Sequence, residues 1–597
     1  MSKDTLLGLP ETRLGFVPGL GGTQRLPRLI GVKNALDIIL SAEPINVNRA
    51  LEMNLIDKIV SPEDLELEME KMACQLMLEA KLEAVDVEYE KQFASGLESR
   101  DQMALKTARR SMRMITKGNY PALLEAIDVI ESGLNSGLKA GLIEEAKTFA
   151  RLAVSEVSRN LVFLFFNSEL IRQSALGGAE KEHLIPVKTI GIIGGGMMGM
   201  SLAKYLAQGG FRILFRSFDK SRTAQAYENI RSDLDKGAAR RPEESNGAEK
   251  ANDIHICAVT DDQDFSDADI IIEAIEENLS AKVSLLRDLK NIVKEDCLLA
   301  TITSSLSVTD IACELKPQIS FMGAHFFHPV EKMPLVEIAM PNTDYIAKNE
   351  LETNYRRANA KLMHFVAQLG KTPLSVKDST CFLVNRLLAV YLLEAARLAQ
   401  ANVPLSWIDK AAVDFGMPIG PLTLLDEIGT DIALLVADAL TKQYPERIVL
   451  PSVLRKVEAL GMKGKRFGNG IYMWDSNGKR LGINPGLIEQ IGLKDSEINL
   501  DENESARISA SLILPMIDEA AQCLEEKVVR RAREVDIGCV LGLGFPAFRG
   551  GILKYGDSIG LNQVVKQLDE IYAQSEPKRK TSNMLTSLVE KNSKFYS

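Results

Sequence analysis

Two ionisable residues stand where a strand of a sheet would present them. His325 follows the strand-like run "QISFMGA", and Glu337 lies twelve residues later in "LVEI". An imidazole titrates near neutral pH, so it can accept a proton during catalysis. A carboxylate that accepts the other ring N–H fixes the tautomer and stabilises the imidazolium. A histidine after a strand is more often structural, so this pair needs support from other motifs.

A glycine pattern supplies the first such motif. Gly194, Gly196 and Gly199 form G-x-G-x-x-G directly after the apolar run "TIGII" and before a helical stretch. In a βαβ unit the first glycine permits a tight turn, the second admits a pyrophosphate, and the third lets helix and strand pack closely. The context predicts a dinucleotide site, and a glycine-rich turn without a ligand is the alternative.

The type of dinucleotide depends on the end of the next strand, "FRILFR". An acidic residue there normally hydrogen-bonds the ribose 2′-OH of NAD, whereas an arginine accommodates the 2′-phosphate of NADP. This chain offers Arg216 and Ser217 at that place, and Asp219 two residues later. NAD is the expected cofactor if Asp219 reaches the ribose, and NADP stays open as the alternative.

The elements that must position these residues differ along the chain. With 597 residues, the protein is too long for one domain, at about 150 residues per domain. Residues 61–180 repeat apolar side chains at helical spacing, whereas residues 186–375 alternate β-branched runs with helical stretches. The sequence after residue 375 again has apolar residues at helical spacing. We therefore expect a multidomain α/β plus all-α protein with a doubly wound sheet in its middle.

The last part of the chain contains an internal repeat. Residues 392–429 resemble residues 517–557, with Glu394 and Glu519 lying 125 positions apart. The Gly-x-Pro turns at Gly416 and Gly544 lie 128 positions apart. The spacing predicts two tandem copies of one helical domain, joined through "KRFGNGIYMWDSNGKR".

Composition limits the functional class. The net charge of −10 argues against nucleic-acid binding. Seven scattered cysteines without a C-x-x-C pair give neither a zinc site nor a disulfide framework, so we expect no metal. No apolar run is long enough for an integral membrane segment, and no leader is visible, so the expected location is cytoplasmic. A targeting signal in a lost N-terminus would change that location to an organelle.

Four ordered motifs resemble a known family. The glycine loop is followed by "TSSLS", "HFFHPVEKMPLVEI" and "FLVNRLL". Together with the C-terminal repeat, they resemble the 3-hydroxyacyl-CoA dehydrogenases. Near the start, "LPETRLGFVPGLGGTQRLPRLIG" resembles the enoyl-CoA hydratase (crotonase) family. The multifunctional α subunits of fatty-acid β-oxidation complexes combine both on one chain, and the resemblance covers nearly the whole sequence.

The resemblance implies roles for individual residues. It implies that His325 is the base and Glu337 its partner. Ser304 and Asn385 match positions that hydrogen-bond the 3-oxygen and the acyl carbonyl of the substrate. Two further matches lie near the nicotinamide ribose, although an exposed helix face would explain them equally well: Glu277 and Lys282.

The chain departs from the family pattern at several walls of the site. The usual Ser-Asn-Thr-Ser is here Thr301-Ile302-Thr303-Ser304, so Ile302 replaces an amide. His328 replaces an asparagine in His-Phe-Phe-Asn-Pro. Thr380 and Cys381 replace the usual Pro-Gly pair before "FLVN". Hydride transfer is still expected, with altered rate or substrate range.

The hydratase-like motif is expected to be inactive. Family hydratases place two glutamates around one water and use two backbone N–H groups for the thioester oxyanion. Glu11 matches the second glutamate, whereas the first and both N–H donors precede it by more than this sequence contains. We therefore expect a C-terminal remnant of a crotonase fold that lacks its N-terminal part.

These observations fix the expected architecture and function. The chain should oxidise (S)-3-hydroxyacyl-CoA thioesters to 3-oxoacyl-CoA with NAD in β-oxidation. The rival is a non-catalytic descendant that binds acyl-CoA or a thiolase. Expected partners are the acyl-CoA substrate, a thiolase β subunit and a second copy in a homodimer. The expected parts are the truncated hydratase domain (1–150), a linker helix (151–185), a Rossmann-type NAD-binding domain (186–375) and two helical dehydrogenase domains (376–480 and 481–597).

Overall fold

The structure is a computed structural model with two compact units. It describes residues 1–2, 5–78, 97–177, 186–239, 255–315, 320–342, 350–496, 498–575 and 578–596. One unit comprises Met1–Phe165 with two short later segments, and the other holds nearly all the rest of the chain. Across the described residues, no helix has both the length and the apolarity to cross a membrane.

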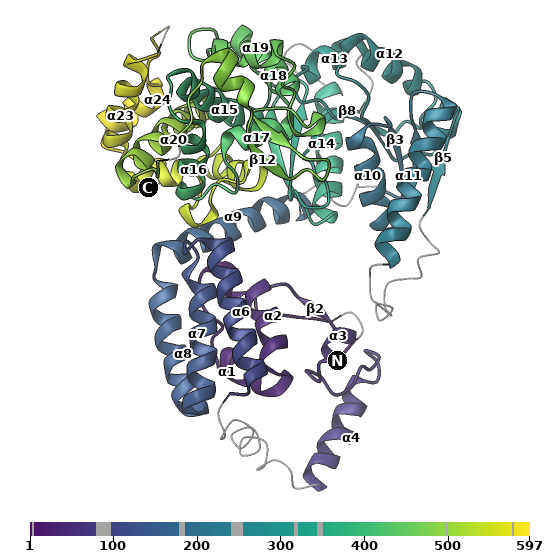
Figure 1. The fold of residues 1–597 in the computed structure, drawn as a ribbon. Coiled ribbons are helices and arrows are strands. Elements are labelled where there is room, and N and C mark those ends of the chain that lie inside the picture. The colour runs from purple at the N-terminus through teal and green to yellow at the C-terminus, as the bar shows by residue number, and fades with distance from the viewer. Residues whose placement is uncertain are drawn as a thin grey trace. The chain divides into compact units, whose positions relative to one another are not determined.

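The N-terminal unit is mainly helical. Helices α7 and α8 pack against each other over a core that includes Leu36, Ile127 and Ile130 (Figure 1). Its elements are β1 (Leu6–Leu7), a 3-10 turn (Glu11–Leu14), α1 (Gly22–Ile30), α2 (Val32–Ser41), β2 (Ile45–Asn46), α3 (Val47–Glu52), α4 (Leu65–Leu78), α6 (Ser99–Thr116), α7 (Pro121–Ser136) and α8 (Leu138–Ala153). Helix α9 (Glu156–Gly177) occupies most of the predicted linker, whose residues 178–185 lie outside the described part.

The second unit begins with an eight-stranded sheet in the order β10-β9-β8-β7-β6-β3-β4-β5. All neighbouring strands are parallel except β8 and β9, which are antiparallel. The strands are β3 (Thr189–Ile193), β4 (Arg212–Arg216), β5 (Ile256–Ala258), β6 (Ile270–Glu273), β7 (Leu298–Thr301), β8 (Phe321–Phe326), β9 (Leu335–Met340) and β10 (Thr372–Lys377). The predicted doubly wound sheet is therefore present.

Helices cover this sheet and explain its apolar sequence. Strands β3, β6 and β7 are buried at every residue, as expected for parallel strands with both faces covered. Helix α10 packs on β3 and β4, and α14 packs on β8, β9 and β10 (Figure 1). The covering helices are α10 (Met197–Gln208), α11 (Lys220–Ala239), α12 (Leu279–Lys290), α13 (Val308–Leu315) and α14 (Glu350–Gln368).

The remainder of the second unit consists of helices with one small ribbon. The helices are α15 (Val384–Gln400), α16 (Leu405–Phe415), α17 (Pro421–Ile428), α18 (Thr430–Gln443), α19 (Ser452–Ala459), α20 (Glu502–Glu525), α21 (Ala532–Gly538), α22 (Ile552–Ile559), α23 (Leu561–Ala573) and α24 (Asn583–Glu590). The joining segment begins with a 3-10 turn (Lys465–Phe467) and continues into β11 (Tyr472–Trp474), which pairs with β12 (Arg480–Ile483) as an antiparallel strand.

The internal repeat is visible in matched buried carboxylates. Asp409 accepts hydrogen bonds from the backbone N–H of Leu422, in the first turn of α17, and from the hydroxyl of Tyr472. Asp536 accepts the same pair of bonds from Leu553 in α22 and from Tyr596. The two aspartates lie 127 positions apart, close to the spacings in the sequence.

Candidate active site

His325 and Glu337 face each other across two strands. His325 on β8 is the register partner of Glu337 on β9. The Nδ1 atom of His325 lies 2.7 Å from Oε2 of Glu337, and both residues are buried. This antiparallel pair sits at the carboxyl end of β8, because β9 runs back along it. The sheet therefore brings together two residues that are twelve positions apart in sequence.

The same carboxylate also anchors helix α15. Its Oε1 accepts the backbone N–H groups of Leu383 and Val384, each at 3.0 Å. The chain enters this helix through Cys381 and Phe382, whose φ angles are +63° and +51°. A left-handed backbone explains why glycine is usual at the Cys381 position of the family pattern. The turn places the Phe382 ring 5.7 Å from the imidazole of His325.

The two predicted substrate-binding side chains occupy different surroundings. Ser304 lies in the loop after β7 and lines the same cavity as His325. Asn385 lies in the first turn of α15, next to Val384, and is partly buried. It does not line that cavity in the described structure. Their roles toward substrate remain predictions.

Glu277 holds the loop that carries Ser304. Its Oε1 accepts the Thr303 hydroxyl at 2.7 Å and the backbone N–H groups of Ser304 and Ser305 at 3.0 Å. Burial raises the pKa of Glu277, but these hydrogen bonds and the charge of Lys282 outweigh it and lower that pKa. Glu277 does not line the cavity and acts on the site through this loop.

Lys282 is fully buried behind the loop. Its Nζ lies 2.7 Å from Glu273 Oε1 and 3.6 Å from Glu277 Oε2. Glu273, at the end of β6, also accepts the hydroxyl of Thr301 at 2.6 Å. Burial raises the pKa of Glu273, and the charge of Lys282 opposes that rise. The sequence analysis did not predict a role for Glu273, although an acidic residue at the end of an apolar strand could have indicated one.

The glycine loop has the shape that a dinucleotide requires. Gly194 has φ of +142°, and a Cβ there would lie 2.2 Å from the carbonyl oxygen of Ala274. A Cβ on Gly199 would lie 1.9 Å from the carbonyl oxygen of Gly194. Around Gly196 there is open space, as expected where a pyrophosphate approaches the backbone.

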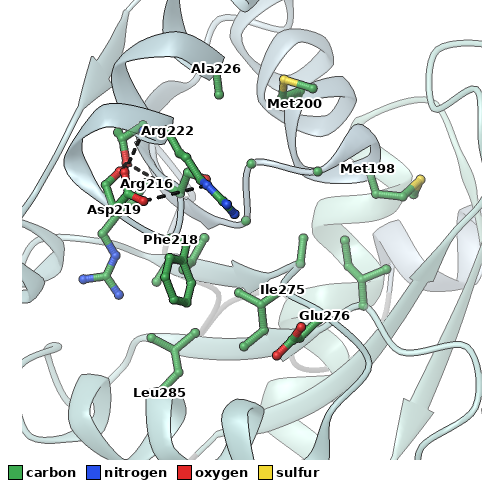
Figure 2. A pocket seen from close by; sticks show the side chains of 18 of the residues that line it. Met198, Met200, Arg216, Phe218, Asp219, Arg222, Ala226, Ile275, Glu276 and Leu285 are labelled. Atoms are coloured by element: carbon green, nitrogen blue, oxygen red, sulfur yellow. Dashed lines mark hydrogen bonds and ion pairs between the residues drawn. The ribbon is translucent and has the colours of Figure 1, made fainter.

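A cavity of about 1760 Å³ joins the glycine loop to His325. Figure 2 shows Arg216, Phe218, Asp219 and Arg222 gathered at one end of it, with Met198 toward the other. Among the residues predicted for catalysis or cofactor binding, those that line it are Gly194, Gly196, Ser217, Asp219, Ser304 and His325. Cavity residues that the sequence reading missed include Phe218, Arg222 and Glu276. Each follows the carboxyl end of a parallel strand or begins the next helix, which was the available signal.

The departures from the family pattern have identifiable surroundings. Ile302 lines the cavity, so its apolar side chain does replace an amide on that wall. Thr303 binds Glu277, whereas His328 is exposed. Although the motif differs from the family pattern at Ile302, the loop that carries Ser304 is still held by its hydrogen bonds to Glu277.

In the N-terminal unit, the hydratase-like motif is held by internal contacts. Within the described residues, Oε2 of Glu11 is buried and has no hydrogen-bond partner. The backbone N–H groups of Gly21 and Thr23 donate to the buried carboxylate of Glu145, at 2.6 and 2.9 Å. These amides of the glycine-rich loop are therefore not available to a ligand.

The chain matches three known families over four regions. Residues 189–379 match the family described as "3-hydroxyacyl-CoA dehydrogenase, NAD binding domain". Residues 382–474 and 508–594 both match "3-hydroxyacyl-CoA dehydrogenase, C-terminal domain". Residues 1–119 match "Enoyl-CoA hydratase/isomerase".

Curated proteins match along most of the chain. The "Fatty acid oxidation complex subunit alpha" of Idiomarina loihiensis is 34% identical over 605 residues, which covers 100% of this chain and 82% of the relative. The protein of the same name from Vibrio vulnificus is 34% identical, covering 95% of this chain and 77% of the relative.

One solved structure supports the fold. The 3-hydroxybutyryl-CoA dehydrogenase of Escherichia coli K12 superposes with a TM-score of 0.54 at 22% identity. The match covers 68% of this chain and 100% of that protein. At this identity the match supports the fold alone.

Proposed function

The chain belongs to the family of fatty acid oxidation complex alpha subunits, and on this premise we propose that His325 and Glu337 carry its catalysis. The membership and the matched domains confirm the predicted fold class: a hydratase-like part, a Rossmann-type domain and helical C-terminal domains. They also confirm an NAD-dependent 3-hydroxyacyl-CoA dehydrogenase of fatty-acid β-oxidation, which acts on CoA thioesters. The chain is therefore an enzyme, and the non-catalytic alternative is set aside.

His325 is the proposed base. Bound NAD would supply the acceptor for the hydride that leaves C3 of the (S)-3-hydroxyacyl thioester. The hydroxyl proton of C3 passes to Nε2 of His325, while Nδ1 stays hydrogen-bonded to Glu337 at 2.7 Å. The Glu337 carboxylate then faces an imidazolium and stabilises it. The observation that carries this proposal is the buried His325–Glu337 pair at the wall of the dinucleotide cavity.

Two further residues would bind the thioester. We propose that Ser304 donates a hydrogen bond to the 3-oxygen and that Asn385 hydrogen-bonds the acyl carbonyl. Support for Ser304 is its position on the cavity wall with His325. For Glu277 and Lys282 we propose a positioning role in place of the predicted contacts with the nicotinamide ribose. Glu277 binds the loop of Ser304, and Lys282 lies 3.6 Å from Glu277.

The residues of the cavity fit a dinucleotide. Gly194 and Gly196 would lie against the pyrophosphate, and Gly199 lets α10 begin close to the loop. At the other end, Ser217 and Asp219 line the space expected for the adenosine ribose.

A single assay tests the proposed base. Purified chain is mixed with acetoacetyl-CoA and NADH, and the loss of NADH absorbance is followed beside the variant His325→Ala. We expect turnover by the unmodified chain and a loss of about 100-fold or more in the variant, because general-base catalysis contributes that much. Matched turnover by a folded His325→Ala chain would refute the role of His325.

We also propose that the hydratase-like part of this chain does not hydrate enoyl-CoA. The support is local, because Glu11 is without a hydrogen-bond partner at Oε2 among the described residues and Glu145 occupies the loop amides. Incubation with crotonyl-CoA should leave its enoyl-thioester absorbance unchanged. Hydration that disappears in the variant Glu11→Gln would overturn this proposal.

The chain is also expected to assemble with other subunits. Relatives are named as alpha subunits of a complex, which supports a partner subunit, and we propose that it is a thiolase. We further propose a homodimer, a cytoplasmic location and the division at residues 150, 185, 375 and 480. Light scattering of the purified chain, alone and with a thiolase, would test both assemblies.

A further inference from the structure

The adenosine end of the cavity begins at Arg216. This residue is the last of β4, and its carbonyl oxygen accepts the N–H of Gly194 at 2.8 Å. Its side chain therefore starts beside the glycine loop, at the place from which dinucleotide sites read the ribose 2′ position. An acid at this place selects NAD, and an arginine accommodates the 2′-phosphate of NADP.

The nearby carboxylates are already engaged. Asp219 Oδ1 accepts the N–H of Arg222 at 2.8 Å, and its Oδ2 lies 3.8 Å from the Arg222 guanidinium. Asp262 forms an ion pair with one nitrogen of Arg216. Arg222 thus competes with a ribose hydroxyl for Asp219, and Arg216 competes with one for Asp262. A phosphate would meet cations at this end of the cavity: Arg216, Lys220 and Arg222.

The chain between these groups offers further contacts. Ser217 lines the cavity, and its hydroxyl lies against the glycine loop, because a Cβ on Gly195 would be 2.2 Å from it. Phe218 is 89% exposed yet lies on the cavity wall, with the Arg222 guanidinium 5.7 Å from its ring (Figure 2). An aromatic ring in this position provides a face for an adenine base.

We propose that this end of the cavity binds the 2′-phosphate of NADP(H), through Arg216, Ser217 and Arg222, and favours it over the free hydroxyl of NAD(H). The proposal rests on the proposed function, because it concerns the cofactor of the same site. The preference concerns relative affinity: NAD remains a cofactor of this site, NADP(H) binds it more tightly, and the chemistry at His325 is as described.

Equilibrium binding tests this preference without relying on activity. NADPH and NADH are titrated into the full chain by cofactor fluorescence, and 2′,5′-ADP and ADP are compared as competitors. A charge-assisted hydrogen bond supplies about a tenfold change in Kd, so we expect NADPH to bind at least about tenfold more tightly than NADH. As a competitor, 2′,5′-ADP should have an affinity for the chain that is higher than that of ADP by a similar factor.

Three variants locate the contact. Arg216→Gln should weaken NADPH about tenfold and change NADH by less than about twofold. Because Arg216 also pairs with Asp262, the exposed Arg222→Gln serves as a second variant, with a smaller loss in the same direction. The matched control is Arg212→Gln, which removes the same charge from the exposed start of β4, away from the cavity.

The results distinguish a failure of the proposed phosphate site from a failure of the proposed function. Tighter binding of NADH than of NADPH, with acetoacetyl-CoA turnover intact, overturns the phosphate site and leaves the proposed function standing. A folded chain that binds neither dinucleotide overturns both. An equal loss of NADPH affinity in the Arg212 control also contradicts a local phosphate contact.

Discussion

At the scale of single residues, Glu337 has two structural roles. One carboxylate oxygen orients His325, and the other accepts the two backbone N–H groups at the start of α15. Glutamine keeps the shape of glutamate but has one oxygen and a donor in place of the second. Glu337→Gln must therefore either lose the histidine contact or turn a donor toward the helix amides.

We expect Glu337→Gln to lower kcat about 100-fold or more, with a smaller effect on KM, because the imidazolium loses its partner. Steady-state kinetics with acetoacetyl-CoA measure both constants. Glu295→Gln, which removes an exposed carboxylate from the same unit, is the control and should leave kcat unchanged. A kcat for Glu337→Gln equal to that of the control would contradict the assigned partner.

The buried carboxyl of Asp536 makes stability depend on pH. Burial raises its pKa from 3.8 to about 7, against the opposing hydrogen bonds from Tyr596 and the start of α22. Between these two values the folded state holds a proton that the unfolded state has released. The free energy of unfolding should therefore fall as pH rises from about 4 to about 7, and level off above that.

Urea unfolding at several pH values, with Asp536→Asn beside the unmodified chain, tests this direction. The free energy of unfolding of the variant should decline less steeply as pH rises, since asparagine does not titrate. Some decline should persist, because burial also raises the pKa of Asp409 and Asp518. Parallel pH profiles for the two chains would show that Asp536 is not responsible.

At the scale of elements, the loop of Ser304 depends on Glu277. Replacing Glu277 with alanine leaves the Thr303 hydroxyl and two backbone N–H groups without their acceptor. A lost acceptor costs about 1–3 kcal/mol for each buried donor, so the loop should move instead of holding its position. We expect Glu277→Ala to reduce kcat/KM at least about tenfold with a modest loss of thermal stability. Unchanged kinetics would mean that another contact holds the loop.

The sequence predicted most strands of the sheet but not the register in which they pair. Uninterrupted apolar runs and G-x-G-x-x-G marked β3 and the strands around it, because parallel strands with both faces covered have apolar sequences. The antiparallel pairing of β8 with β9 set His325 opposite Glu337, and spacing alone did not specify that register. The roles of Glu273 and Lys282 also required the fold, since buried ion pairs leave no periodic pattern.

For the whole molecule, the two helical copies hold each other through reciprocal ion pairs. Arg386 of the first copy is fully buried and bonds Glu519 and Glu526 of the second. In the opposite direction, Arg579 of the second copy lies 2.6 Å from Glu394 of the first. Glu394 and Glu519 are the pair that first revealed the repeat in the sequence. Their shared position therefore has a structural reason, because each copy supplies an acid and an arginine to the other.

This arrangement predicts that the copies unfold as one unit. Arg386→Met removes the cation and leaves Glu519 buried without its main partner, which costs about 3–5 kcal/mol. The double variant Arg386→Met with Glu519→Met should recover much of that loss, because two apolar side chains replace the buried pair. Denaturant unfolding of the four chains in the cycle measures the coupling between the residues. Additive losses in the double variant would show that the two copies are not joined through this contact.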